Sequence, residues 1–157
     1  MNGPGTLILA GFNSYAGGTV VNAGTLQLGS SAALPSGGAL TVNGGTLALN
    51  SNNAAVGALS GTGGTISLGA GTLTTNSAAS TALASAITGT GSLVKRGIRV
   101  LTLSGNNGGF TGDTILNGGG LIVSGNLGSA VTVNSGMLGG SGTIGSLVTN
   151  GGLVAPG

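Results

Sequence analysis

The sequence predicts an all-β fold, a single right-handed parallel β-helix (β-solenoid) of about seven to eight coils. Three observations predict it: a unit recurs about every twenty residues, its apolar residues alternate with small or polar ones, and glycine and asparagine separate the alternating stretches. Alternation with a period of two is typical of β-strands. Glycine and asparagine tolerate the positive φ angles of tight turns.

The short repeat reads apolar-x-apolar-Asn-x-Gly-x-apolar, and it sets the expected coil length. Its copies lie at 20–26, 40–47, 115–121, 131–138 and 147–153. The marker residues Leu7, Leu26, Leu47 and Ile66 are 19, 21 and 19 positions apart, and the spacing shortens to 17 and 15 near the end. Successive coils of such a fold stack about 4.8 Å apart. We therefore expect Asn22 and Asn43 to stack at one corner, with their side-chain amides bonded along the axis.

Alternation places the clearest strands at residues 6–9, 25–28, 46–49 and 101–103, with leucine on one face. The alanine-rich segment Ser77–Ile87 is compatible with a helix. We favour a coil with small inward residues, because the same apolar spacing also fits two short strands. A sandwich of β-hairpins is the alternative fold, because Asn-Gly also favours hairpin turns. The regular recurrence of one unit favours the solenoid.

The composition excludes most enzyme classes. The 157 residues include 37 glycines but only four charged residues, Lys95, Arg96, Arg99 and Asp113, and neither histidine nor cysteine. A zinc site, a carboxylate pair for glycoside hydrolysis and a calcium-loaded Asp repeat all need residues that are missing. We therefore expect no catalytic residue, no metal site and no cofactor. A net charge of +2 is too small for nucleic-acid binding, and no segment is apolar for long enough to form a transmembrane helix.

A longer repeat is also present, because residues 5–26 match residues 99–121 with an offset of 94 and then 95. Over these segments the chain resembles the passenger-associated repeat of bacterial autotransporters. The pattern of that repeat is roughly Leu-x-Lys-x-Gly-x-Gly-x-Leu-x-Leu-x-Gly-x-Asn-x-Tyr-x-Gly-x-Thr-x-apolar-x-x-Gly-x-Leu. The first copy fits at Leu7, Leu9, Gly11, Asn13, Tyr15, Gly17 and Thr19, and the second at Lys95, Gly97, Leu101, Leu103, Gly105, Asn107, Gly112 and Thr114. Ile98, Arg99 and Phe110 depart from the pattern.

This resemblance implies a non-catalytic, surface-exposed β-helical stalk that supports export, display, adhesion or self-association. It implies an extracellular location on the bacterial cell surface, reached through the outer membrane with a C-terminal translocator barrel expected in the parent chain. We expect residues 1–157 to form one passenger segment cut from a longer chain, with the long repeat at about 3–29 and 92–125. Self-association along the solenoid, a host surface and a glycan are the expected partners.

Two sets of residues are candidates for binding. Lys95, Arg96 and Arg99 form the only cationic cluster and are a weak anion or glycan contact, or else a solvated strand edge. Tyr15 and Phe110 occupy equivalent places and could stack on sugar rings, or else plug a turn. The alternative functions are a carbohydrate-active β-helix enzyme fragment and an ice-binding or aggregating β-solenoid.

Overall fold

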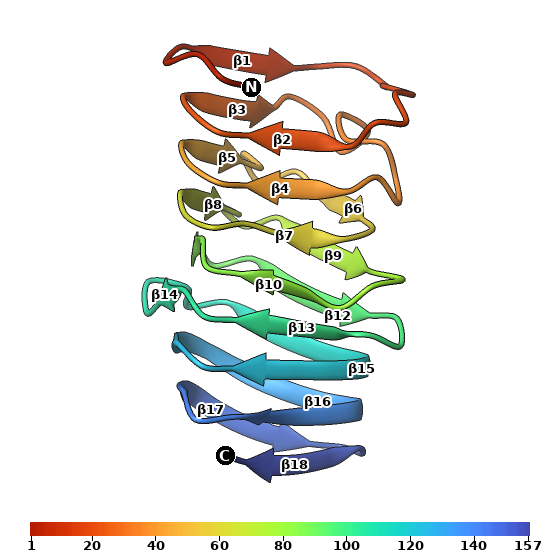
Figure 1. Ribbon diagram of the computed structural model, residues 1–157, viewed down its shortest axis with the longest axis vertical. Coiled ribbons are helices and arrows are strands. Elements are labelled where there is room, and N and C mark those ends of the chain that lie inside the picture. The colour runs from red at the N-terminus through yellow and green to blue at the C-terminus, as the bar shows by residue number, and fades with distance from the viewer.

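The computed structural model describes all residues from 1 to 157, and its chain winds into a parallel β-solenoid of about eight turns. In Figure 1 the front strands run to the left and the rear strands to the right as the chain descends from the N-terminus, which makes the coil right-handed. Every strand pairing is parallel. No helix forms, so none could cross a membrane. The predicted β-helix is confirmed.

The rear face of the upper coils in Figure 1 is a five-stranded sheet whose strands come from successive coils. Its strands are β1 (Thr6–Leu9), β3 (Thr25–Leu28), β5 (Thr46–Ala48), β8 (Thr65–Ser67) and β11 (Ala86–Thr88). The predicted markers Leu7, Leu26, Leu47 and Ile66 are direct partners in this sheet. The first residues of four of these strands form a threonine row, Thr6, Thr25, Thr46 and Thr65.

Two further faces complete each coil. The front face begins with β2 (Thr19–Val21), β4 (Leu40–Val42) and β7 (Leu59–Ser60), and β10 (Thr81–Leu83) and β13 (Val100–Leu103) follow below them. The third face is built from β6 (Ala54–Val56), β9 (Thr72–Asn76) and β12 (Ser92–Arg96). In the lower coils longer strands turn the corner between faces: β15 (Asp113–Val123), β16 (Asn126–Gly140) and β17 (Thr143–Thr149). The short β14 (Asn106–Asn107) lies at one edge, and the four-residue β18 (Leu153–Pro156) pairs with the end of β16.

The segment Ser77–Ile87 forms no helix. It contributes β10 and β11, two three-residue strands separated by a short turn. Leu83 and Ile87 are fully buried and Ser85 between them donates a hydrogen bond to the carbonyl of Val42 at 2.8 Å. The inward positions decide the conformation here, because stacking on the coils above and below outweighs the weak helix preference of alanine. The expectation of a coil that fits two short strands, rather than a helix, is confirmed.

Inward side chains form one continuous core of 28 buried apolar residues that extends through the stack. Outside it, asparagines form hydrogen-bonded ladders along the axis. Asn43 donates its side-chain amide to Asn22 at 2.9 Å, and Asn22 donates to Asn2 at 2.7 Å. The expected stacking of Asn22 and Asn43 is therefore confirmed. Each ladder ties adjacent coils together at a corner where the backbone leaves the sheet.

Glycines also stack, at a corner where adjacent coils approach most closely. Gly71, Gly91 and Gly112 lie one above another, and a Cβ atom on each would overlap a carbonyl oxygen of the coil above, from Asn52, Gly71 and Gly91 in turn. Only a residue without a side chain permits this backbone approach. Much of the glycine content therefore serves coil-to-coil contact rather than flexibility.

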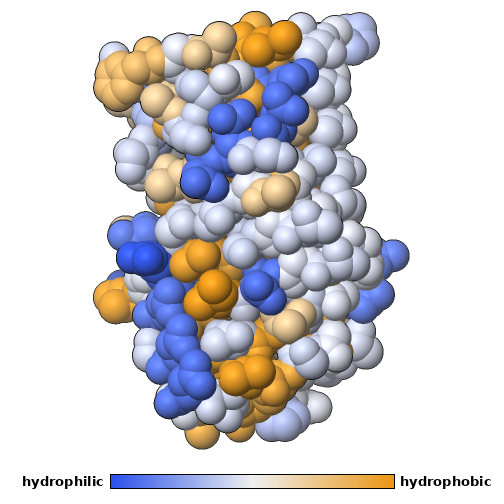
Figure 2. Space-filling view, turned by 180° about the vertical axis from the view of Figure 1, so that it is seen from behind, coloured by the Kyte–Doolittle hydropathy of each residue, from blue (hydrophilic) through white to orange (hydrophobic).

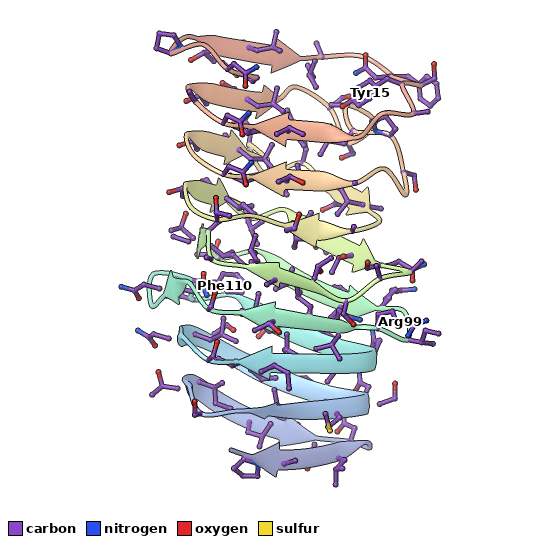
Figure 3. All side chains as sticks on the ribbon, viewed as in Figure 1. Tyr15, Arg99 and Phe110 are labelled. Carbon is purple, nitrogen blue, oxygen red and sulfur yellow. The ribbon has the colours of Figure 1, made fainter.

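The two copies of the long repeat lie on different faces of the solenoid. Leu7 and Leu101 are 94 positions apart, which at about twenty residues a coil is about two-thirds of a coil beyond a whole number. The first copy accordingly begins on the rear strand β1, and the second on the front strand β13 (Figure 1). Figure 3 shows the result, with Tyr15 and Phe110 at opposite edges of the stack.

Candidate functional site at the second long repeat

Lys95 is the largest fully buried side chain of the protein, and its ammonium group lies under the turn between β12 and β13. Its Nζ donates hydrogen bonds to the carbonyl oxygens of Arg96 at 2.6 Å, Gly97 at 3.2 Å and Gly118 at 3.4 Å. The first two belong to its own coil and the third to the coil below. The ammonium group thus links two coils through backbone carbonyls, with no carboxylate involved.

The expectation of one solvent-facing cationic cluster is wrong for Lys95, which is 1% exposed. The reason is strand alternation. Leu93 and Lys95 share the inward face of β12, while Val94 points outward. Burial lowers the pKa of the Lys95 ammonium below its ordinary value of 10.5, because removal from water disfavours the charged form.

The turn that Lys95 underlies, Gly97 to Arg99, carries the exposed cations. The side chains of Arg96 and Arg99 are exposed, and Ile98 between them is 82% exposed. Gly97 has a φ angle of 77°, in the left-handed region where glycine is favoured. A shallow hollow adjoins the turn and is lined by Asn76, Ser77, Ala78, Gly97, Ile98 and Arg99. Arg99 projects from the edge of the solenoid in Figure 3.

An asparagine ladder ends at this turn. Asn150 donates to Asn134 at 2.7 Å and Asn134 donates to Asn117 at 2.8 Å. The register that pairs Lys95 with Leu116 places Arg96 next to Asn117, in the ladder position of the coil above. On its other side Arg96 is paired with Asn76. A column of hydrophilic side chains also runs down the lower left of Figure 2, over the last coils. Arg96 therefore interrupts a column of asparagines.

Phe110 lies at the opposite edge and is fully buried. Near it, the buried side chain of Asn107 accepts a hydrogen bond from the backbone N–H of Ile87 at 2.7 Å and donates one to the carbonyl of Gly105 at 3.2 Å. Both residues belong to the centre of the long repeat. In this copy the repeat residues cover the core at a corner of the coil. The ring of Phe110 is inaccessible to a sugar, because the residue is fully buried.

Tyr15, the counterpart of Phe110, is 37% exposed and shares a hydrogen bond of 2.7 Å with the hydroxyl of Thr19. Asn13 repeats part of the Asn107 arrangement, because it donates to the carbonyl of Gly11, two residues earlier, at 3.1 Å. The two copies thus share a local asparagine bond, while their aromatic residues differ in exposure. Phe110 is covered by coils on both sides, whereas Tyr15 lies in the first coil.

Comparison with known proteins supports the resemblance seen in the sequence. A family model described as the passenger-associated-transport-repeat matches residues 1–28 and 93–123. Adhesin BmaC autotransporter from Brucella suis biovar 1 is 42% identical over 125 residues, which cover 74% of this chain and 4% of that protein. The chain carries passenger-associated transport repeats of the autotransporter type. It thus corresponds to a small part of the length of this relative, and no solved structure matches it.

The repeats and the similar adhesin support export of the protein that contains this chain to the cell surface through the outer membrane. The candidate residues of the chain do not form one site. Arg96 ends β12 and Arg99 ends the turn that follows it, Lys95 lies beneath this turn, and Tyr15 and Phe110 are elsewhere. Asp113 is exposed at the start of β15, opposite Ser92. No three His, Cys, Asp or Glu residues are grouped as metal ligands would be.

Sequence reasoning missed three features of the chain. It did not place Lys95 inside, although Lys95 and Leu93 lie two positions apart and therefore face the same side of a strand. It did not extend the asparagine ladder to Asn117, Asn134 and Asn150, although their spacing of 17 and 16 follows the coil length. It also overlooked Phe12, which is 83% exposed beside a shallow hollow in the first coils; no periodic signal pointed to this residue.

Proposed function

We propose that this passenger segment is a non-catalytic stalk that holds a surface protein away from the cell and supports adhesion. The continuous core of 28 residues carries the proposal, because an uninterrupted stack of coils is a stiff, elongated spacer. Similarity to an autotransporter adhesin supports the same role. The chain has a single carboxylate and no histidine or cysteine, so it has few of the side chains that serve in general acid–base catalysis.

We further propose that folding of this stack outside the cell assists export. Each coil contacts mainly its neighbours, so an emerging coil can template the next one. Leu47 and Leu103 are fully buried inward positions, and aspartate there would place an unpaired charge in the core. We expect Leu47→Asp and Leu103→Asp, made in the parent protein, to reduce the amount of passenger at the cell surface.

Matched controls are available on the same strands. Ala48→Asp and Thr102→Asp place the same charge on half-buried outward positions next to Leu47 and Leu103. Surface-exposed passenger is measured by antibody labelling of intact cells, against total protein. The export proposal is refuted if the inward and outward aspartates give the same surface yield.

Lateral self-association is the second part of this proposed role. The outward faces carry threonine, serine and asparagine with almost no charge, so little repulsion opposes side-by-side pairing. Sedimentation at rising concentration tests this, and a strict monomer at the highest concentration would contradict it. The ice-binding alternative is less favoured, because the threonine row is one residue wide: the next outward row reads Ile8, Gln27, Ala48 and Ser67.

A further inference from the structure

The turn Gly97–Arg99 carries an arrangement of donors that goes beyond the proposed stalk function. We propose that this turn, with Arg96 and Asn117, is a binding site for a phosphate group, carried by a lipid headgroup or free in solution. The site differs from a simple cationic cluster, because Lys95 contributes indirectly and backbone N–H groups contribute directly.

The buried ammonium group of Lys95 orients the peptide groups of the turn. Its Nζ binds the carbonyl oxygens of Arg96 and Gly97 from the inside. All peptide bonds are trans, so the N–H on the far side of each carbonyl points the opposite way. The N–H groups of Gly97 and Ile98 are therefore directed away from Lys95, toward the solvent side of the turn.

These N–H groups have no partner within the protein. None of the backbone hydrogen bonds outside the strands has the N–H of Gly97, Ile98 or Arg99 as donor, and no side chain accepts from them. At an exposed turn water satisfies such groups. Successive free N–H groups next to a residue in the left-handed conformation, here Gly97, are typical of anion-binding backbone sites.

The asparagine ladder adds a further donor. Every amide in it donates toward the N-terminal coil, from Asn150 to Asn134 and from Asn134 to Asn117. The amide nitrogen of Asn117 is therefore left without an acceptor at the end that lies next to Arg96. Aligned amide dipoles place their positive end there, as the dipoles of a helix do at its N-terminus.

The two exposed arginines complete the site. Their guanidinium groups form charge-assisted, bidentate hydrogen bonds with phosphate oxygens. Asp113, the only carboxylate, lies near the other end of β12, opposite Ser92, and does not compete for them.

Few hydrogen-bond acceptors are free near the turn. The carbonyls of Arg96 and Gly97 are already bound by Lys95, and that of Arg99 accepts the N–H of Gly120 at 3.3 Å. Of the nearby side chains, the amide oxygen of Asn76, which lies 2.6 Å from the position of a Cβ on Gly97, and the hydroxyl of Ser77, which also lines the hollow, can act as acceptors. Donors thus outnumber acceptors, which favours an oxyanion.

Titration of the ¹⁵N-labelled chain with inorganic phosphate tests the proposal. We expect the amide resonances of Gly97, Ile98 and Arg99 to shift, and Arg96→Gln/Arg99→Gln to bind phosphate about tenfold more weakly. A control variant adds Ala10→Arg and Thr111→Arg to this pair, which restores the net charge at exposed positions elsewhere. Absence of shifts at the turn, or full binding by the control variant, would overturn the proposal.

Two further measurements separate the sources of phosphate and the role of Lys95. Co-sedimentation with vesicles of phosphatidylglycerol and phosphatidylcholine that depends on the arginines supports a lipid headgroup, whereas binding of inorganic phosphate alone supports a soluble phosphate group. Lys95→Met keeps both arginines but frees the carbonyls, so we expect smaller shifts at Gly97 and Ile98. A failure of all these tests would leave the stalk function untouched, because export and surface yield are measured independently.

Discussion

The side-chain oxygen of Asn107 accepts the backbone N–H of Ile87, 20 residues earlier, at 2.7 Å. Ile87 lies on β11, the last strand of the five-stranded sheet, where no further strand supplies a backbone acceptor. A side chain of the long repeat thus replaces a missing carbonyl and allows the stack to continue below a sheet that has ended. The repeat asparagine is a joint between two sections of the solenoid.

Asn107→Ala should therefore destabilise the protein by about 1–3 kcal/mol, because it leaves a buried N–H without an acceptor. Asn106→Ala is the control, since Asn106 is exposed and its hydrogen bonds are long, at 3.3 and 3.4 Å. Chemical denaturation measures both changes. Equal effects of the two substitutions would contradict the proposed role of Asn107 in connecting the two sections of the solenoid.

The two aromatic residues of the long repeat should respond differently to mutation. Phe110→Ala leaves a cavity in the core and should cost about 3–5 kcal/mol. Tyr15→Phe removes only the hydrogen bond to Thr19 at a partly exposed site and should cost about 0.5–1 kcal/mol. Denaturation midpoints check both values. A small effect of Phe110→Ala would show that this residue does not support the core.

Gly112→Ala should destabilise the fold by about 3 kcal/mol, because the new Cβ would overlap the carbonyl oxygen of Gly91 and force the coils apart. Gly109→Ala is the matched control. A Cβ there meets only the methyl group of Thr88, at 3.8 Å. Thermal unfolding followed by circular dichroism compares the two, and a tolerated Gly112→Ala would contradict the close approach of coils at this corner.

The stability of the protein should rise with pH in the alkaline range. The pKa of Lys95 is lowered in the folded state by burial, so between that pKa and 10.5 the unfolded chain binds more protons than the folded chain. Raising the pH through this window therefore removes an electrostatic cost of folding. Lys95→Met should abolish the rise, as measured by urea unfolding from pH 8 upward. If the stability of the variant still rose with pH, the rise would have to come from another titrating group.

The fold was predictable from the sequence because its physical cause is periodic. Leu26, Leu47 and Ile66 recur at coil spacing, and direct stacking follows from that regularity alone. The interior position of Lys95 was predictable in principle from its parity with Leu93, but the neighbouring Arg96 and Arg99 suggested a surface cluster instead.

The joint at Asn107 could not be predicted, because it depends on where one sheet ends. That end is a property of the whole stack, in which the coil lengths drift from 21 to about 15 residues and change which strands face each other. The unpartnered N–H groups of Gly97 and Ile98 were also beyond the sequence. Their direction depends on the hydrogen bonds of one buried ammonium group with the carbonyls of Arg96 and Gly97.

The offset of the long repeat has a consequence for recognition at the cell surface. Because its two copies lie 94 positions apart and begin on different faces, each further copy at the same spacing would be rotated by about a third of a turn around the axis. A flat partner lying along such a rod would meet about every third copy. A partner that wound around the rod could contact them all.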